Sequence, residues 1–595
     1  MDLKEEAPID VVEESAPGEA SDSEKIDVET IAPRDENGTL LDECRILLSN
    51  VPKFLGYKGL KSFFAKHIPN FGYKKVRQVG NIVYVSFDQA EEAKRAVEIL
   101  DGQVLKKSTL KARAAPTDLK KTIEKPSSTL QLADPESLRA KTAKSIVSPL
   151  ADLPYPEQIT KKHEKSLDVA LKLTRTMQHQ QSLAKDRDLR KLVKEVVPSA
   201  IYSHYRNKNE FTVGHDLDGQ ICVGFVGGKF SENKHFVIPL GECNLMSTQT
   251  RKIVEDFQEF VGESGLAPFD EFARVGTWKM LTIREFSGDV MMIVTLFPLA
   301  TEEKFSEVKE ALAARYINLE TLRTKGFRVT SLYVSVMEHA GDVLKYDLVA
   351  GAPYIYETIL GCRFRVSAGA FFQTNTVATA TLYTQIAKQC GLYREVSEQP
   401  YKTQENVTDD AQPAEKRMRP AENGEEAKKM VLLDICCGTG TIGQTILANY
   451  PQENAFCIGV EIVESAVADA KINAEANKLA DRSCYIAAKA EDAFRSIKYY
   501  LPPGFTLENS EFIGVLDPPR AGLQNSIVVA CRQLDTLKRL VYVSCDPANA
   551  MRNLSDLCRP TSNKFGGVPF SIETIQPVDL FPQTAHIEWV VTLVR

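Results

Sequence analysis

The sequence predicts an α/β protein with three ordered parts: a small α+β unit near the N-terminus, a β-rich central region, and a C-terminal doubly wound sheet that is mostly parallel. Three observations predict this class. Apolar strand-like runs alternate with helical segments from residue 430 to the end, which is typical of a parallel sheet covered by helices. Strand-like runs dominate residues 200–355, and residues 42–115 follow the order strand, helix, strand, strand, helix, strand. At 595 residues the chain requires more than one hydrophobic core.

The composition is ordinary for a soluble globular protein, with 43% hydrophobic and 26% charged residues. No run of about 18 apolar residues occurs, so we expect no membrane contact. The acidic start lacks the apolar core of a secretory signal. The 12 cysteines are scattered without a Cys-x-x-Cys pair, which argues against a zinc site or a disulfide framework. We therefore expect a reducing location, cytoplasmic, nuclear or both.

The net charge of −7 conceals an uneven distribution. Residues 1–40 hold 13 Asp/Glu against 3 Lys/Arg and are poor in aromatic residues, which predicts a disordered acidic tail. Residues 53–113 instead carry 13 Lys/Arg against 5 Asp/Glu. Such a basic region attracts phosphate backbones, although a solvated surface explains it equally well.

Residues 41–115 are similar to the RNA-recognition motif in the order of their elements. We expect strands at 44–50, 81–87 and about 105–112, and helices at 57–67 and 89–100. The stretches that carry RNA-stacking aromatic residues in that motif have Leu47 and Ile82 at two of those positions, and only Tyr84 keeps a stacking ring. Tyr84 is thus a weak candidate for RNA contact. Binding by charge alone, or binding of a protein, stays open.

The rest of the chain divides into four further segments. Residues 116–197 are expected to be a linker followed by one or two surface helices, and 198–355 a β-rich domain that binds RNA or substrate. Residues 356–595 form the predicted domain with the parallel sheet. Within it, residues 394–430 are rich in Glu, Lys, Gln and Pro and are expected to be a disordered insertion.

A glycine-rich loop follows the apolar strand 431–435. Gly438, Gly440 and Gly443 allow a tight turn against a ligand, and Glu461 ends the next predicted strand, where an acid suits a ribose diol. The spacing matches the dinucleotide fingerprint G-x-G-x-x-G, but it also resembles the S-adenosylmethionine site of class I methyltransferases. The fourth strand favours the second interpretation, because it ends in Asp517 within the sequence DPPR, similar to a motif of nucleic-acid methyltransferases.

Two further strand ends carry reactive side chains. Cys545 lies in the sequence SCDP directly after the apolar run 540–543, and Glu588 begins the apolar run that reaches residue 591. A thiol and a carboxylate at such positions can act as nucleophile and base. Alone, this pairing is weak, because a free cysteine is usually a small buried hydrophobe.

Taken together, these motifs resemble the RNA uracil-5-methyltransferase family, in particular the eukaryotic tRNA-directed members with an RNA-recognition motif before the catalytic part. The resemblance covers roughly 198–595 and implies a class I, Rossmann-like methyltransferase domain dependent on S-adenosylmethionine. Its ordered matches are residues 205–211, 367–375, 434–438, 459–461, 517–520, 544–547 and 586–588.

The resemblance implies a role for each matched position. The cofactor contacts fall on Gln373, Cys436, Gly438, Thr441, Glu461 and Asp517. Cys545 falls on the nucleophile, Glu588 on the proton acceptor, and Arg520 on a substrate contact. Two positions depart from the family: Asp546 stands where many members have Asn, and Cys436 where an aromatic residue is common. An iron–sulfur cluster, known in some bacterial relatives, is not expected, since Cys44 is the only cysteine before residue 222.

The chemistry expected from this resemblance is methylation of uracil C5 through a covalent adduct between Cys545 and C6. The substrate that it implies is the T-loop uridine of tRNA, position 54 in tRNA numbering, and the flipped base must reach both residues. If the sheet has the order usual for class I methyltransferases, its antiparallel seventh strand brings Glu588 beside Cys545. We expect a monomer. Two alternatives stay open: the same chemistry on rRNA or mRNA, and an RNA-binding or chaperone protein with reduced catalytic activity.

Overall fold

The computed structural model describes residues 41–52, 56–69, 71–79, 81–87, 89–105, 108–116, 138–228, 236–270, 273–338, 344–393, 429–450 and 454–595. The chain divides into two compact units, Met1–Leu132 and Ala133–Arg595. The acidic tail predicted for 1–40 lies outside the described residues. So does the predicted insertion, except that residues 429 and 430 already belong to a strand.

The first unit has the predicted order of strands and helices. Its elements are β1 (Leu41–Ser49), α1 (Gly56–His67), β2 (Tyr73–Val79), β3 (Ile82–Phe87), α2 (Ala90–Leu100), β4 (Val104–Leu105), β5 (Ser108–Thr109) and β6 (Lys111–Pro116). The four-stranded sheet has the order β2-β3-β1-β6, and its pairs are antiparallel. The prediction for the last strand was wrong: it covers Lys111–Pro116 rather than about 105–112. The preceding residues instead fold back as the small hairpin β4–β5.

The two faces of this sheet differ in how they are packed. Ile46 and Leu48 of β1 belong to the core that the helices build with Phe64 and Ala96. Because side chains alternate along a strand, Leu47 and Tyr84 lie on the opposite face, where they pair across β1 and β3 and contact Ala115. The Tyr84 ring is only 7% exposed, and the Arg45 guanidinium lies 5.5 Å from its centroid.

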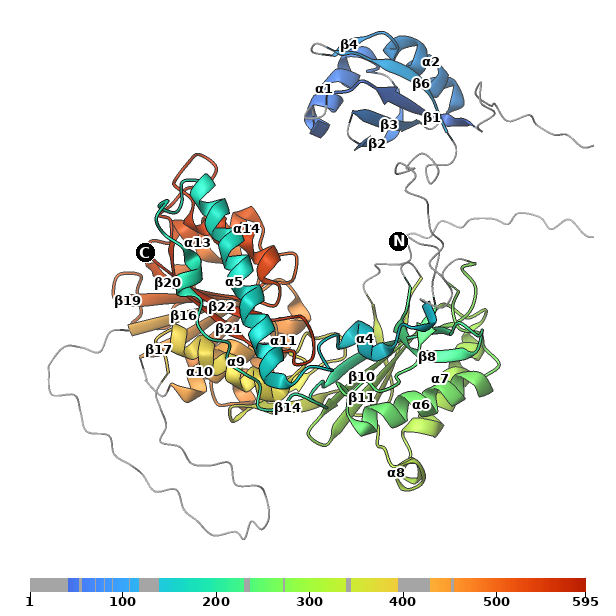
Figure 1. Ribbon diagram of the computed structural model, residues 1–595, viewed down its shortest axis with the longest axis vertical. Coiled ribbons are helices and arrows are strands. Elements are labelled where there is room, and N and C mark those ends of the chain that lie inside the picture. The colour runs from blue at the N-terminus through green and yellow to red at the C-terminus, as the bar shows by residue number, and fades with distance from the viewer. Residues whose placement is uncertain are drawn as a thin grey trace, which may run out of the picture. The chain divides into compact units, whose positions relative to one another are not determined.

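The second unit contains a β-rich sheet, here called the central sheet, as predicted for residues 198–355. Its elements are β7 (Lys208–His215), β8 (Ile221–Val226), β9 (Val237–Ile238), α6 (Thr248–Glu263), β10 (Trp278–Phe286), β11 (Asp289–Leu296), α7 (Glu302–Tyr316), α8 (Leu319–Lys325), β12 (Ser331–Val336) and β13 (Tyr346–Gly351). The order is β13-β12-β11-β10-β7-β8-β9, with β11 and β12 parallel. Helices α6 and α7 cover one face (Figure 1), and their side chains share one core with the strands.

The remaining elements build a separate two-stranded hairpin and a second seven-stranded sheet, here called the C-terminal sheet. The elements are the hairpin β14 (Ile355–Ile359) and β15 (Cys362–Val366), α9 (Thr376–Gln389), β16 (Lys429–Ile435), α10 (Thr441–Asn449), β17 (Ala455–Glu461), α11 (Glu464–Ala476), η3 (Ala480–Arg482), β18 (Ser483–Ala487), α12 (Ala490–Arg495), η4 (Ile497–Tyr499), β19 (Ser510–Leu516), α13 (Asn525–Gln533), β20 (Leu537–Ser544), α14 (Pro547–Cys558), β21 (Ser571–Val578) and β22 (Glu588–Val594). Preceding them in sequence are α4 (Ala143–Val147), α5 (Tyr155–His179) and η1 (Leu189–Leu192).

The order of the C-terminal sheet is β18-β17-β16-β19-β20-β22-β21. Strands β16 to β20 are parallel, and β22 is inserted antiparallel between β20 and β21. This is the order expected for a class I methyltransferase. Successive residues of β16 alternate between two cores, with Leu432 in one and Leu433 in the other, so helices cover both faces of the sheet.

Within 156–197, where one or two surface helices were predicted, the structure has α5, a surface helix with one buried face. This single 25-residue helix packs against the C-terminal sheet (Figure 1). Leu173 and Met177 enter the same core as Trp589, and Lys162 is 1% exposed. The many charges of α5 concealed its buried face in the sequence. A lysine is rarely buried without a partner, and no partner of Lys162 is evident nearby in the sequence. Here the partner is Asp579, 2.6 Å away and more than 400 residues distant along the chain.

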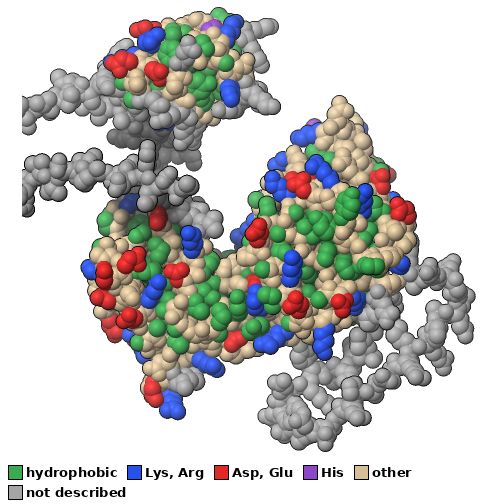
Figure 2. Space-filling view, turned by 180° about the vertical axis from the view of Figure 1, so that it is seen from behind, with side chains coloured by type: hydrophobic (Ala, Val, Ile, Leu, Met, Phe, Trp, Pro, Cys, Tyr) green, Lys and Arg blue, Asp and Glu red, His purple; other side chains and the backbone are tan. Residues whose placement is uncertain are grey.

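Within the second unit, the central and C-terminal sheets form two lobes with a concave surface between them (Figure 2). The lobes contact each other through Asn207, whose backbone N–H donates to Thr374 O at 2.9 Å and whose side chain donates to Gln373 O at 3.1 Å. In the described part of the chain, none of the helices has the length and apolar character needed to cross a bilayer.

Candidate active site

The ends of the parallel strands bring the predicted site residues of the C-terminal sheet to one edge. Ile435 at the end of β16 pairs with Val460 of β17 and with Leu516 of β19. Glu461 and Asp517 each follow one of these partners, so they flank the loop that leaves β16. The carboxyl ends of the strands in an open α/β sheet form its ligand crevice. We call this edge, formed where β16, β17, β19 and β20 end, the carboxyl edge.

The loop after β16 has the backbone that its glycines predict. Gly438 and Gly440 have φ values of +52° and +78°, a region that favours glycine. A Cβ on Gly440 would lie 2.9 Å from an atom of the Tyr485 ring, while a Cβ on Gly438 would meet nothing within 4 Å. Cys436 also has a positive φ, +63°, and burial raises the pKa of its thiol to about 12. The loop therefore approaches open space at Gly438, and Cys436 is not a reactive thiol.

Asp434 supports this loop from below. Its Oδ2 accepts the backbone N–H of Gly443 at 2.8 Å, while Oδ1 is buried without a hydrogen-bond partner. Burial, together with the nearby charges of Asp517 and Glu461, raises the pKa of Asp434 from 3.8 to about 7, although the hydrogen bond from Gly443 opposes this rise. No lysine or arginine of the described residues forms an ion pair with Asp434. The site thus carries more negative charge than its protein surroundings balance.

Glu461 is held at the tip of β17 by three backbone donors. Its Oε1 accepts from the N–H groups of Ile462 and Val463, and its Oε2 accepts from Gly438 at 3.2 Å. A carboxylate offers about four acceptor positions, so one stays available for a ligand hydroxyl. Ile462 and Val463 are 65% and 50% exposed beside it. These two apolar side chains can cover a flat ring, and no motif used in the sequence analysis identified them.

Two further predicted cofactor residues lie around the same edge. Asp517 follows β19, and burial raises its pKa from 3.8 to about 6. Thr441 begins α10 and shares a 2.7 Å hydrogen bond with the hydroxyl of Tyr383 in α9. Gln373 lies in the loop before α9 and is 8% exposed. Sequence reasoning missed Tyr383, because a helical tyrosine carries no signal that distinguishes it from a core residue.

The register of β20 and β22 brings Cys545 and Glu588 together. Ser544 pairs with Trp589, so the residues one step beyond, Cys545 and Glu588, lie opposite each other where the two antiparallel strands meet the carboxyl edge. Burial and the charge of Glu588 raise the pKa of the Cys545 thiol. The nearby Arg520 guanidinium opposes both effects, because its positive charge and its N–H groups favour the thiolate.

Glu588 is enclosed by protein. It is 1% exposed, and its Oε2 has no hydrogen-bond partner. Burial raises the pKa of Glu588 well above its usual value, and Asp517 adds to this while Arg520 opposes it. A carboxylate whose pKa is raised takes up a proton more readily, which suits a proton acceptor.

The structure thus places eight of the predicted residues, including Arg520, around the carboxyl edge or in the loops and helix that border it. Gln373 lies apart from these eight in the loop before α9, where its backbone contacts Asn207. Tyr84 belongs to the first unit, and its position relative to this edge is not defined. Its side chain is nearly covered, which disfavours stacking of a base on the ring. Base stacking on Tyr84 stays a prediction. In the described part of the chain, no group of three or more His, Cys, Asp or Glu side chains is arranged to hold a metal ion.

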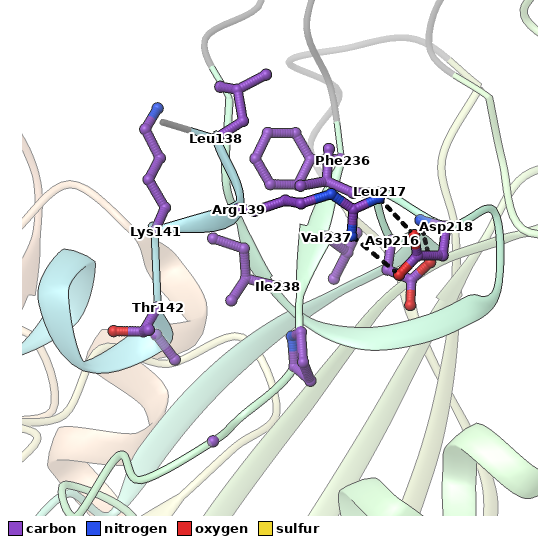
Figure 3. A pocket seen from close by; sticks show the side chains of 13 residues that line it. Leu138, Arg139, Lys141, Thr142, Asp216, Leu217, Asp218, Phe236, Val237 and Ile238 are labelled. Carbon is purple, nitrogen blue, oxygen red and sulfur yellow. Dashed lines mark hydrogen bonds and ion pairs between the residues drawn. The ribbon is translucent and has the colours of Figure 1, made fainter. Parts of the chain in front are cut away.

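A separate pocket of about 290 Å³ lies in the lobe of the central sheet, away from the carboxyl edge (Figure 3). Its wall includes Phe236 and Ile238 and the ion pair between Arg139 and Asp218, at 2.7 Å. None of the predicted site residues lines this pocket.

Known proteins resemble this chain over most of its length. The family described as tRNA (Uracil-5-)-methyltransferase matches residues 385–595. The "tRNA (uracil-5-)-methyltransferase homolog A" of Mus musculus is 31% identical over 587 residues, which cover 93% of this chain and 84% of the relative. The protein of the same name from Homo sapiens is 30% identical and covers 93% and 82%. "Homolog B" of Mus musculus is 30% identical and covers 76% and 85%.

Among solved structures, the tRNA (uracil-54, C5)-methyltransferase of Pyrococcus abyssi, in complex with S-adenosyl-L-homocysteine, has a TM-score of 0.48 and 19% identity. The likeness covers 83% of this chain and 90% of the archaeal one.

Proposed function

We infer, because this chain belongs to the tRNA (uracil-5-)-methyltransferase family, that it methylates C5 of a uracil in tRNA, with S-adenosyl-L-methionine as the methyl donor and Cys545 as the nucleophile. The observation that carries the inference is the β20–β22 register, which places Cys545 opposite Glu588 at the carboxyl edge. The Arg520 guanidinium lies near enough to the same thiol to lower its pKa. A nucleophile, a proton acceptor and a cation thus meet at one point.

The residues of the carboxyl edge fit S-adenosylmethionine. Its sulfonium is a cation, and Asp434, Asp517 and Glu461 supply negative charge that the protein does not balance. The free acceptor position of Glu461 suits a ribose hydroxyl, and Ile462 and Val463 suit the adenine ring. A dinucleotide fits less well, because its pyrophosphate would meet these acids, and the N–H of Gly443 is already bonded to Asp434.

Cys545 activates the base. C5 of uracil is a poor nucleophile, so the thiolate first adds to C6, and the electrons of the C5–C6 double bond move onto the O4 enolate. Arg520 favours the thiolate that this step needs. The cofactor, when bound, supplies an electrophilic methyl group that C5 can take.

Glu588 completes the reaction. After methylation, C5 carries both the methyl group and a proton. Glu588 removes this proton, the C5–C6 double bond re-forms, and the bond between C6 and the Cys545 sulfur breaks to release the thiolate. The raised pKa of Glu588 makes its carboxylate a stronger base for this purpose. No other acid lies opposite Cys545 in the described β20–β22 register.

The substrate position that we propose is uridine 54 in the T loop of tRNA. The named substrate of the archaeal protein, uracil 54, is compatible with this choice but comes from another chain. Because Cys545 is half-buried and Glu588 fully buried, the base must leave its stack to reach them. A monomeric state, and a location in the cytoplasm, the nucleus or both, remain our predictions from the sequence.

The test is to map the product. The purified protein is incubated with labelled S-adenosylmethionine and unmodified tRNA transcripts, of which one set carries cytidine at position 54. We expect 5-methyluridine at position 54 and no label on the substituted transcript. Methylation of rRNA or mRNA fragments in preference to tRNA would overturn the substrate assignment. Binding of tRNA without methyl transfer would favour the RNA-binding or chaperone alternative.

A further inference from the structure

Nine residues, 579–587, connect β21 to β22 and end at Glu588. Apart from Phe581, Ala585 and His586 they are buried, although they form neither helix nor strand. Buried backbone groups in an irregular segment require hydrogen-bond partners. Residues near 150–200 supply several of them: Val197 O accepts from Asp579 N at 2.9 Å, and Gln583 O accepts from Leu150 N at 2.9 Å.

One face of α5 supplies the side-chain partners. Gln158, Lys162 and Ser166 are spaced four residues apart, so they lie above one another on the helix, and they are 3%, 1% and 1% exposed. We call these three residues the polar stripe of α5. Gln158 Oε1 accepts the N–H of Gln583 at 2.7 Å. Lys162 Nζ donates to Asp579 Oδ1 at 2.6 Å and to Phe581 O at 2.8 Å.

The polar stripe also holds the residue after Glu588. The indole N–H of Trp589 donates to Ser166 Oγ at 3.1 Å. Trp589 in turn pairs with Ser544, the neighbour of Cys545. The polar stripe therefore fixes the chain on both sides of Glu588. The contact between Ser166 and Trp589 lies one residue from Glu588, which is the residue opposite Cys545.

Stability alone does not explain a buried lysine here. Removing a lysine and a carboxylate from water costs free energy that their attraction only partly returns, and apolar replacements are often as stable. The site offsets this cost by full hydrogen bonding: Asp579 also accepts from the Tyr155 hydroxyl at 3.0 Å and from Phe581 N at 3.2 Å. Such a network fixes one geometry, and the geometry it fixes is that of the segment leading to Glu588.

We propose that the polar stripe of α5 positions Glu588 for proton removal, with Lys162 as its central residue. This inference rests on the role of Glu588 given under the proposed function. Lys162 touches neither Cys545 nor Glu588 in any contact of the described residues, so it is a positioning residue and not a catalytic one. Its main effect falls on the last step, because addition of Cys545 and methylation of C5 do not use Glu588 as a base.

The test separates the last step from the earlier ones. In tRNA containing 5-fluorouracil, C5 carries fluorine where Glu588 would remove a proton, so the reaction stops at the methylated adduct on Cys545. We compare the wild-type protein with the double variant Lys162→Met/Asp579→Asn, which removes both charges and leaves no unpaired buried ion. Lys161→Met, the same change at an exposed neighbour on α5, is the control.

We expect the double variant to form the 5-fluorouracil adduct at the wild-type rate. Its turnover on normal tRNA should fall roughly tenfold or more, because small displacements of a reacting group are costly, while KM for tRNA stays unchanged and methylated covalent complex accumulates. The control should match the wild type in both assays. An equal fall in both rates, or no change in either, would overturn the proposal. Absence of an adduct in the wild-type protein would instead contradict the proposed function.

Discussion

The carboxyl edge of the C-terminal sheet has two halves that are supported in different ways. In the cofactor half, two of the three acids are held by backbone groups within 25 residues in sequence: Asp434 by Gly443, nine residues away, and Glu461 by Gly438, 23 residues away. In the reacting half, a helix more than 400 residues distant holds the chain on both sides of Glu588: Lys162 contacts the segment before it, and Ser166 contacts Trp589 after it. The first half is a local loop structure, while the second depends on the tertiary fold.

This difference matters for how each half responds to change. A local loop can keep its geometry when a distant part of the chain is altered. The reacting half cannot, because the position of Glu588 depends on whether α5 is in place. We therefore expect substitutions in the reacting half to change the rate most, and substitutions in the cofactor half to change stability or binding by smaller amounts.

The largest effect is expected for Glu588→Gln in the reacting half. Glutamine keeps the shape but cannot take the C5 proton, and general base catalysis contributes about 10²–10⁴-fold. Turnover should fall by at least about 100-fold, while labelled methyl groups accumulate in a denaturation-resistant complex of protein and tRNA. The label is measured after gel separation. Glu573→Gln, on the exposed side of the neighbouring β21, is the control. Near-normal turnover of Glu588→Gln would remove this residue from its role.

A smaller effect, on stability, is expected for Asp434→Asn in the cofactor half. The pKa of Asp434 is about 7 in the folded protein and 3.8 in the unfolded chain. As pH rises, the unfolded chain loses this proton first, so stability falls between about pH 4 and pH 7 by up to roughly 4 kcal/mol. Asparagine has no such proton. The melting temperature of the cofactor-free variant, relative to that of the wild type, should therefore increase between about pH 4 and pH 7.

Asp481→Asn, an exposed acid in η3, provides the comparison for that pH series. It should follow the wild type at every pH. If Asp434→Asn also followed the wild type, Asp434 would titrate as an ordinary surface acid, and the excess negative charge that we assign to the cofactor half would not exist.

The smallest effect is expected for Tyr383→Phe. This change removes only the hydroxyl that shares a hydrogen bond with Thr441 at the start of α10. A single hydrogen bond of this kind contributes about 1 kcal/mol net, so urea denaturation should show a loss of about that size in the free energy of unfolding. Tyr393→Phe, at a 40% exposed position, should show none. A larger loss in catalytic rate than in stability would mean that Tyr383 acts on the reaction itself.

The contrast between the halves also explains what could be predicted from the sequence. The strands that end at Ile435, Glu461 and Leu516 were predictable because apolar runs and glycines determine them locally. The pairing of Cys545 with Glu588 required the sheet order, which the sequence alone supplied only through a family resemblance. Once that order is given, the register follows from the strands themselves.

The contribution of α5 was not predictable in the same way. Lys162 lies in a helix with many charges, and only the burial of Asp579 more than 400 residues later shows that one of these charges faces inward. The last strand of the first unit was misplaced for a related reason. The strand-like residues near 105 form the hairpin β4–β5, and only the pairing with β1 identifies Lys111–Pro116 as the strand of the four-stranded sheet.

The most direct test of the central claim is to locate the covalent bond. The wild-type protein is incubated with S-adenosylmethionine and tRNA containing 5-fluorouracil, digested with protease and nuclease, and analysed by mass spectrometry. We predict a methylated fluorouridine attached to the peptide that contains Cys545. The adduct should persist in Cys484→Ala, which alters a cysteine on the opposite side of the same sheet, and be absent in Cys545→Ala. An adduct on any other residue, or an undiminished adduct in Cys545→Ala, would contradict the account.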